Sequence, residues 1–192
     1  MINNKKLILG SASLGRRKVL EDLGYKFDIL VSDIDEKAIR DDDPQILTSK
    51  LANAKADALL DNIKEPAILI TSDQVVKYNG TIREKPSNEK EAREFLRSYA
   101  LHPAEAINTV VVTDTETKKR IERSDNTKVY FKTIPDEIID KLIAKGDIFK
   151  QAGGFSVNDP LVKPYVIKID GETESLLGMP KTMIQKLLKK LT

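Results

Sequence analysis

"KLILGSASLGRRKVLEDLG" (residues 6–24) is the stretch that decides the expected fold. It begins as a short apolar run, passes through small residues, and continues with Val19, Leu20 and Leu23 at helical spacing before Gly24. This order predicts a strand, a turn and a helix. A turn in this position directs backbone N–H groups, helped by the helix dipole, at an anion.

The turn itself allows two interpretations. Gly10 and Gly15 have the G-x-x-x-x-G spacing of a Walker A loop, but Arg16 and Arg17 stand where Lys and Ser or Thr would follow. Two serines, Ser11 and Ser13, add hydroxyl donors, and arginine binds phosphate through two parallel hydrogen bonds. The stretch is therefore either a phosphate-binding turn of another design or a tight turn with two solvated arginines.

Composition limits the class of protein. The 192 residues suffice for one compact domain, or for two small lobes that share a cleft. A net charge of +2, from 32 basic and 30 acidic residues, disfavours a nucleic-acid partner. The absence of Cys excludes disulfides and thiol nucleophiles. Together with the presence of only one His it also disfavours metal sites built from Cys or His, so any metal must be held by carboxylates.

No stretch of the sequence is long and apolar enough to predict a membrane-spanning helix, so no association with a membrane is expected. The longest apolar runs, at residues 67–70 and 109–112, are far shorter than the roughly 18 residues that span a bilayer. The apolar run after Lys5 and Lys6 is also too short for a signal peptide. We therefore expect a cytoplasmic protein.

Strand and helix patterns alternate near the start of the chain, and hairpins dominate its middle. Strands are expected at residues 25–33, at 66–73 with its end at Asp73, on both sides of Asn79-Gly80, at 104–114, 118–132 and 164–170. Helices are expected at residues 46–62, 88–100 and 135–146, and from Pro180 onward. This pattern predicts an α/β fold with a mixed sheet flanked by helices.

Two carboxylates are candidates for chemistry. Asp73 ends a strand that is expected to be buried, and ligand sites of α/β sheets lie beyond such strand ends. Glu36 lies in the acidic stretch "DIDE" (residues 33–36). Local pattern alone equally allows Asp73 to cap a turn and Glu36 to be solvated.

Five motifs in one order connect these residues: "SASLGRR" (11–17), "DIDE" (33–36), "SDQVV" (72–76), "REKP" (83–86) and "LLGMP" (176–180). Through them the whole chain, residues 1–192 as a single domain, resembles the Maf family, first named for inhibiting septum formation. The resemblance implies an elongated, ITPase-like mixed sheet with two lobes around a central cleft, and a homodimer. It also implies a hydrolase that cleaves nucleoside triphosphates between the α and β phosphates, with Mg²⁺ or Mn²⁺ as cofactor.

Site residues follow from the same resemblance, position by position. The residues expected to contact the substrate are Ser11, Ser13, Arg16, Arg17, Lys55 and Gln74. The residues expected to be catalytic are Glu36, Asp73 and Lys85. Both carboxylates are hard oxygen ligands suited to Mg²⁺. We expect Asp73 to orient the attacking water and Glu36 to hold the metal, although the two roles can be exchanged.

Three departures from the family pattern bear on mechanism and substrate. Leu14-Gly15 replaces a frequent Pro-Arg, which loosens the turn. The pair Asp73-Gln74 is similar to the one in the branch of the family that acts on 7-methyl-GTP and related modified nucleotides, whereas members that act on UTP and dTTP have Asp-Thr. Asn158 stands near a position where relatives carry Gln or Glu, so UTP or dTTP stays the alternative substrate.

Two further alternatives concern the class of function. The same cleft can serve a nucleotide-binding regulator of cell division without significant turnover, but binding alone does not require carboxylates beside a triphosphate. His102, the only histidine, follows a helix in a loop-like junction beside Pro103 and is expected to be structural rather than catalytic.

Overall fold

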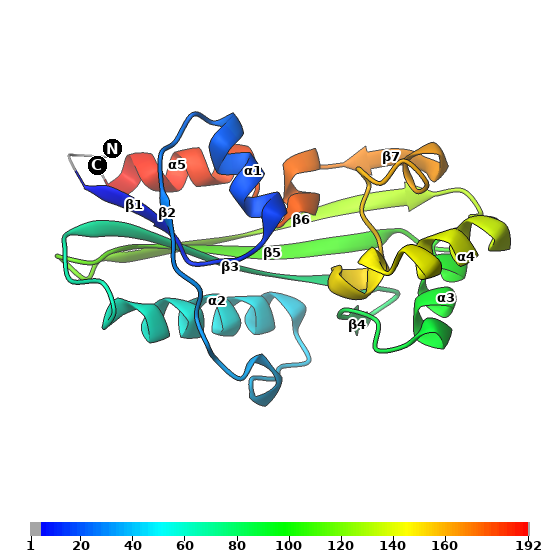
Figure 1. The fold of residues 1–192 in the computed structure, drawn as a ribbon, viewed down its shortest axis with the longest axis horizontal. Coiled ribbons are helices and arrows are strands. Elements are labelled where there is room, and N and C mark those ends of the chain that lie inside the picture. Colours follow the sequence, from blue (N-terminus) through cyan, green and yellow to red (C-terminus); the bar gives the residue numbers. More distant parts are fainter. Residues whose placement is uncertain (1–4, 192) are drawn as a thin grey trace. The chain divides into compact units, whose positions relative to one another are not determined.

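The computed structural model describes residues 5–191, and in this range seven strands form one mixed sheet in the order β2-β1-β3-β5-β6-β7, with β4 paired to β3 (Figure 1). The strands are β1 (Lys6–Leu9), β2 (Asp28–Ile29), β3 (Ala67–Tyr78), β4 (Thr81–Arg83), β5 (Ala104–Asp114), β6 (Arg120–Phe131) and β7 (Val166–Asp170). The α-helices are α1 (Leu14–Asp22), α2 (Pro44–Leu60), α3 (Glu89–Ser98), α4 (Asp136–Lys145) and α5 (Lys181–Leu191). The expected mixed α/β sheet with flanking helices is confirmed.

The chain divides into two compact units. The first comprises Met1–Asp73, Asn108–Asp125 and Leu177–Thr192, and the second comprises Gln74–Ile107 and Asn126–Leu176. Since β3, β5 and β6 each contain a boundary between units, neither unit is one continuous stretch of chain. For this reason no linker marks the units in the sequence.

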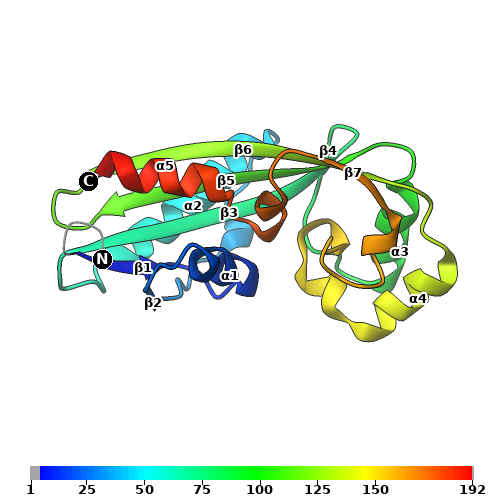
Figure 2. The same cartoon turned by 90° about the horizontal axis from the view of Figure 1, so that it is seen from above.

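The first unit is a sheet covered on both faces. Helices α1 and α5 lie on one face and α2 on the other, as Figures 1 and 2 show. Alternate residues of each strand point to opposite faces. Those that pack with α1 and α5 are Leu7, Leu9, Ile68, Ile70, Val110 and Val112, and those that pack with α2 are Ile8, Ala67, Leu69 and Val111.

The second unit begins with the expected hairpin. Asn79 and Gly80 both have positive φ, 45° and 84°, which matches the two-residue turn that this dipeptide favours. The hairpin joins β3 to β4, with Lys77 opposite Ile82.

Aromatic rings form the core of the second unit. Tyr99 and Phe131 both pack edge-on against Phe155, with ring centroids 5.2 and 5.1 Å away. The buried Arg83 guanidinium lies 3.8 Å from the ring centroid of Tyr78 and donates to Ser98 Oγ at 2.7 Å. These contacts fix the end of β4 against α3.

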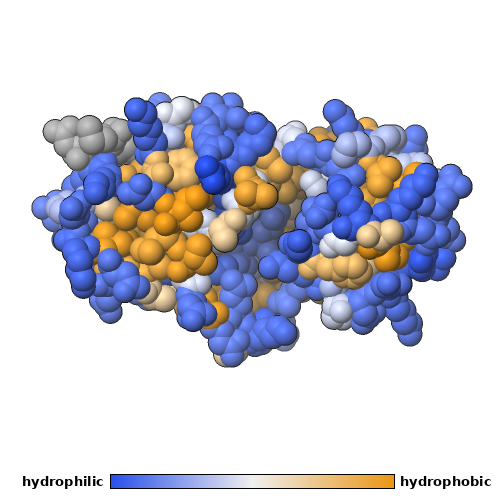
Figure 3. All heavy atoms as spheres, viewed as in Figure 1, coloured by the Kyte–Doolittle hydropathy of each residue, from blue (hydrophilic) through white to orange (hydrophobic). Residues whose placement is uncertain are grey.

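Two expected strands differ in length from the structure. The strand expected at residues 25–33 is reduced to Asp28–Ile29, because β2 is an edge strand that pairs only with the short β1. This segment carries two exposed apolar side chains, Ile29 and Val31. Apolar side chains also gather on the face of the first unit that Figure 3 shows.

The strand expected to end at Asp73 and the strand expected before Asn79-Gly80 form one continuous strand, β3, which ends at Tyr78. Strand β1 ends where Leu9 lies opposite Ile70. Beyond this level β3 continues as a strand because β4 and β5 still pair with it. Asp73 therefore lies inside β3, just beyond the carboxyl end of β1.

No helix in the described range 5–191 has the length and apolar character needed to cross a bilayer.

Asp114 stabilises the connection between β5 and β6. One of its oxygens accepts hydrogen bonds from the N–H groups of Glu116 and Thr117, and Lys5 Nζ contacts its two oxygens at 2.9 and 2.8 Å. Burial acts to raise the pKa of Asp114, but these hydrogen bonds outweigh it and hold that pKa below its ordinary value of 3.8.

Replacing this carboxylate is expected to destabilise the fold in a pH-dependent way. Because the folded state lowers the pKa of Asp114, its contribution is present above the unfolded pKa and is lost as pH falls through the folded pKa. Asp114→Asn should lower the free energy of unfolding by about 1–3 kcal/mol at pH 7, and the loss should shrink only below about pH 4. Urea unfolding across this pH range measures it, with the exposed Asp22→Asn as control. A loss that is independent of pH would contradict this account.

Candidate active site

The turn between β1 and α1 is built on two serines. Ser13 is the N-cap of α1, where its Oγ accepts a hydrogen bond from the N–H of Arg16 at 3.4 Å. Ser11 Oγ accepts from the N–H of Ser13 at 3.2 Å. Gly10 is required here, since a Cβ would lie 2.6 Å from Thr71 Cγ2 on β3. The expected turn is confirmed, with the serines holding its shape.

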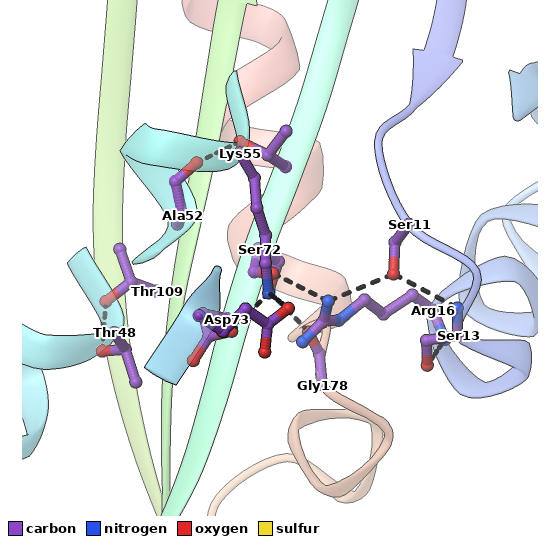
Figure 4. A network of polar contacts seen from close by, with 12 residues as sticks. Ser11, Ser13, Arg16, Thr48, Ala52, Lys55, Ser72, Asp73, Thr109 and Gly178 are labelled. Atoms are coloured by element: carbon purple, nitrogen blue, oxygen red, sulfur yellow. Dashed lines mark hydrogen bonds and ion pairs between the residues drawn. The ribbon is translucent and has the colours of Figure 1, made fainter. Parts of the chain in front are cut away.

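Arg16 is anchored from the first turn of α1. Its Nη1 donates to the carbonyl oxygen of Ser72 at 2.7 Å and to Ser11 Oγ at 3.2 Å, and its Nε donates to the carbonyl oxygen of Gly178 at 3.2 Å (Figure 4). Burial lowers the pKa of Arg16, while the negative charges of Asp73 and Glu36 oppose this shift. The guanidinium is thus fixed by neutral oxygens beside two carboxylates.

Ser72 and Gly178 were not among the residues expected in the site, although both lie within recognised motifs. Ser72 Oγ donates to the carbonyl oxygen of Gly178 at 2.9 Å, which ties β3 to the segment before α5. The same carbonyl accepts from Arg16. A sequence offers no signal for such backbone acceptors, because every residue has a carbonyl group.

Helix α2 brings Lys55 to β3. Thr71 Oγ1, on β3, donates to the carbonyl oxygen of Ala52 at 2.8 Å, and the hydroxyls of Thr48 and Thr109 lie 2.8 Å apart (Figure 4). Ala52 faces the sheet with a small side chain, so the helix can approach it closely. These contacts determine where the Lys55 side chain begins.

The Lys55 ammonium contacts both candidate carboxylates. Its Nζ lies 2.6 Å from Asp73 Oδ1 and 2.9 Å from Glu36 Oε1. Asp73 is buried, and this burial raises its pKa above the ordinary 3.8 against the opposing charges of Lys55 and Arg16. Glu36, at the start of a short 3₁₀ helix (Glu36–Ala38), is half exposed. The structure thus brings together Ser11, Arg16, Glu36, Lys55 and Asp73.

Three other expected site residues have partners or surroundings of their own. Arg17 is exposed and pairs with Glu21 on its own helix at 2.7 Å. Gln74 and Lys85 belong to the second unit, where Gln74 Nε2 donates to the carbonyl oxygen of Ser175 at 3.2 Å and Lys85 is exposed after β4. His102 packs edge-on against Tyr78, with ring centroids 5.8 Å apart. This contact agrees with a structural histidine.

The two carboxylates of the cluster, Asp73 and Glu36, can serve as ligands for a divalent cation. Within residues 5–191, no group of three or more His, Cys, Asp and Glu side chains could hold a metal. Two carboxylates nevertheless converge on one ammonium group, so both are within reach of a single cation. Mg²⁺ commonly takes one or two carboxylates and completes its shell with water and substrate phosphates, so this pair fits it.

The sequence matches one protein family over nearly its whole length. A family profile described as Maf-like protein matches residues 6–191, and the chain belongs to that family. The resemblance drawn from the five motifs is confirmed.

Several relatives are named for an enzymatic activity. The chain is 46% identical over 198 residues to the 7-methyl-GTP pyrophosphatase of Dictyostelium discoideum, with 100% of each chain covered. It is 36% identical over 186 residues to the dTTP/UTP pyrophosphatase of Alkaliphilus metalliredigens, covering 97% and 96% of the two chains. A nucleoside triphosphate pyrophosphatase of Synechococcus sp. is 30% identical over 185 residues, covering 96% and 93%.

Gly15 permits the close approach of α1 to the segment before α5. A Cβ at this position would lie 2.8 Å from the carbonyl oxygen of Leu177, next to the carbonyl that accepts from Arg16. The departure from Pro-Arg to Leu14-Gly15, expected only to loosen the turn, therefore has a packing reason.

Substituting Gly15 tests this packing. Helix propensity alone favours alanine by up to about 1 kcal/mol, whereas the clash with Leu177 should cost about 1–3 kcal/mol. We expect Gly15→Ala to lower the free energy of unfolding in urea despite its better propensity. Lys18→Ala, at an exposed position of the same helix, is the control and should change stability by less than about 0.5 kcal/mol. A Gly15→Ala variant more stable than wild type would show that Leu177 is not packed against α1.

Proposed function

We propose that this protein is a nucleoside triphosphate pyrophosphatase that hydrolyses the bond between the α and β phosphates, giving a nucleoside monophosphate and pyrophosphate. The observation that carries the proposal is the contact of one ammonium, Lys55 Nζ, with the two carboxylates Asp73 and Glu36 beside the anchored Arg16. Cations next to carboxylates suit a reaction in which a charged phosphate is both held and attacked. The names of the relatives agree with this activity.

Binding of the triphosphate is assigned to the basic side chains and the turn. Arg16 presents a guanidinium fixed by Ser72 and Gly178, and Lys55 offers an ammonium on a flexible stem. The N–H groups at the start of α1 add partial positive charge. Arg17 as a phosphate ligand and Lys85 as a catalytic residue stay predictions, since both side chains are exposed and Lys85 belongs to the second unit.

Asp73 is proposed as the group that orients the attacking water and accepts its proton. The water oxygen bonds to the α-phosphorus, the bond from that phosphorus to the bridging oxygen breaks, and pyrophosphate leaves. Burial supports the role, because a raised pKa makes the Asp73 carboxylate a stronger base than an exposed one. Before substrate binds, Lys55 at 2.6 Å and the charge of Arg16 oppose this rise in the pKa of Asp73.

Glu36 is proposed as the main protein ligand of a divalent cation, Mg²⁺ or Mn²⁺, with Asp73 as the second. Its half-exposed position suits an ion that keeps part of its water shell. When bound, such an ion neutralises charge on the phosphates and polarises the bond that breaks.

The substrate class is proposed from Gln74 and from the relatives. Gln74 Nε2 donates to the carbonyl oxygen of Ser175, and the amide oxygen of Gln74 is a hydrogen-bond acceptor of the kind that suits a base edge. The relative that is 46% identical over the whole chain is named for 7-methyl-GTP. We propose a modified guanine nucleotide of that kind, with UTP or dTTP as the second candidate because the relative at 36% is named for them.

Pyrophosphate release over a panel of triphosphates tests this function. With Mg²⁺ or Mn²⁺, we expect the highest kcat/KM for 7-methyl-GTP among 7-methyl-GTP, GTP, UTP, dTTP and ITP. Release should stop when EDTA removes the cation and resume when Mn²⁺ is restored. Preference for UTP or dTTP would favour the second candidate. Binding without release from any member would instead favour a nucleotide-binding regulator.

Asp73→Asn separates chemistry from binding, because it keeps the size of the side chain and removes its charge. We expect kcat to fall by about 10²–10⁴-fold while the nucleotide still binds. Glu36→Gln is the matched comparison, and its loss should be partly recovered at raised Mn²⁺, whereas that of Asp73→Asn should not. Near-wild-type turnover by Asp73→Asn would refute the assigned role.

The expected homodimer and cytoplasmic location stay predictions. Analytical ultracentrifugation and cell fractionation test them directly.

A further inference from the structure

The Lys55 ammonium lies where the two proposed metal ligands meet. Its Nζ contacts Asp73 Oδ1 at 2.6 Å and Glu36 Oε1 at 2.9 Å, and the Lys55 and Asp73 side chains are only 10% and 9% exposed. A cation that bridges the same carboxylates has to approach the region that this ammonium occupies. Lysine and metal therefore compete for one place.

Charge balance strengthens this competition. The cluster contains two cations, Arg16 and Lys55, and two carboxylates, Asp73 and Glu36, and electrostatic interactions couple Asp73 to the other three. A divalent cation that enters such a balanced cluster is repelled by both basic groups. A triphosphate supplies the negative charge that removes this cost.

The two basic residues differ in how they are held. Arg16 donates to the carbonyl oxygens of Ser72 and Gly178, which cannot move without disturbing β3 and the segment before α5. Lys55 instead contacts two carboxylates through a flexible side chain. Its ammonium can therefore move to a phosphate oxygen and exchange one anionic partner for another.

We propose that Lys55 occupies the metal position as an internal cation, so that the divalent cation and the triphosphate load together. The arriving phosphate draws the ammonium from Asp73 and Glu36, and the carboxylates become accessible to the metal. The inference rests on the proposed metal-dependent function and adds a binding order to it.

Titration of the full chain with Mn²⁺ alone tests the proposal. Electron paramagnetic resonance measures the concentration of free Mn²⁺ at each step. Wild type should bind Mn²⁺ weakly without nucleotide, and Lys55→Gln should bind it at least about tenfold more tightly. Lys50→Gln is the matched control, since Lys50 lies on the same helix, is 50% exposed and pairs with Asp41. It should titrate like wild type.

Two more variants guard against a folding artefact. Lys55→Gln leaves Asp73 without its closest cation, so a thermal melt must first show a cooperative transition. Lys55→Arg keeps the positive charge and should bind Mn²⁺ as weakly as wild type. Lys55→Gln combined with Asp73→Asn should lose the gain in affinity.

Three outcomes overturn the proposal: tight Mn²⁺ binding by wild type without nucleotide, a folded Lys55→Gln that titrates like wild type, or a folded Lys55→Arg that binds Mn²⁺ more tightly than wild type. If only one of the two variants folds, its titration alone decides the matter. None of these results measures turnover. An absence of pyrophosphate release, or release that persists in EDTA, would refute the proposed function instead.

Discussion

The contact between the Lys55 ammonium and Asp73 Oδ1 is the interaction on which the rest of the candidate site depends. A carboxylate that is 6% exposed on a central strand requires a cation nearby, because an unpaired buried charge is strongly destabilising. That cation comes from α2, which has to lie close to β3. The small Ala52 and the hydrogen bond from Thr71 to its carbonyl oxygen satisfy this requirement.

The same pair explains why the polar cluster lies where β1 stops. Up to the level of Leu9 and Ile70, both faces of the sheet are filled by apolar side chains that pack under the helices. Beyond that level β3 loses β1 as a neighbour, and Ser72 and Asp73 meet Arg16, which α1 delivers from the turn after β1. The end of one short strand thus converts a hydrophobic core into a site for charged groups.

Much of the fold was predictable because it depends on local chemistry. The capping serine of α1, the Asn79-Gly80 hairpin and Gly146 with φ of 78° after α4 are each set by a few neighbouring residues. The expected length of β2 and the expected break in β3 after Asp73 were wrong because a strand ends where its neighbours end, and neighbours are distant in the sequence. The type and position of Arg17 match a phosphate ligand, and that role stays a prediction; the contact of Arg17 with Glu21, one helical turn away, is a local one.

The sequence alone determined the identities of the reactive groups, the order of the elements that carry them, and the five motifs that indicate the family. Only the tertiary structure decided which groups meet. Arg16 and the carbonyl oxygen of Gly178 are 162 positions apart, and Lys55 reaches Asp73 from a different layer of the first unit. Such contacts result from packing two helices and a returning C-terminal segment on one sheet. Packing is a property of the whole chain, since each position depends on surfaces contributed by all the others.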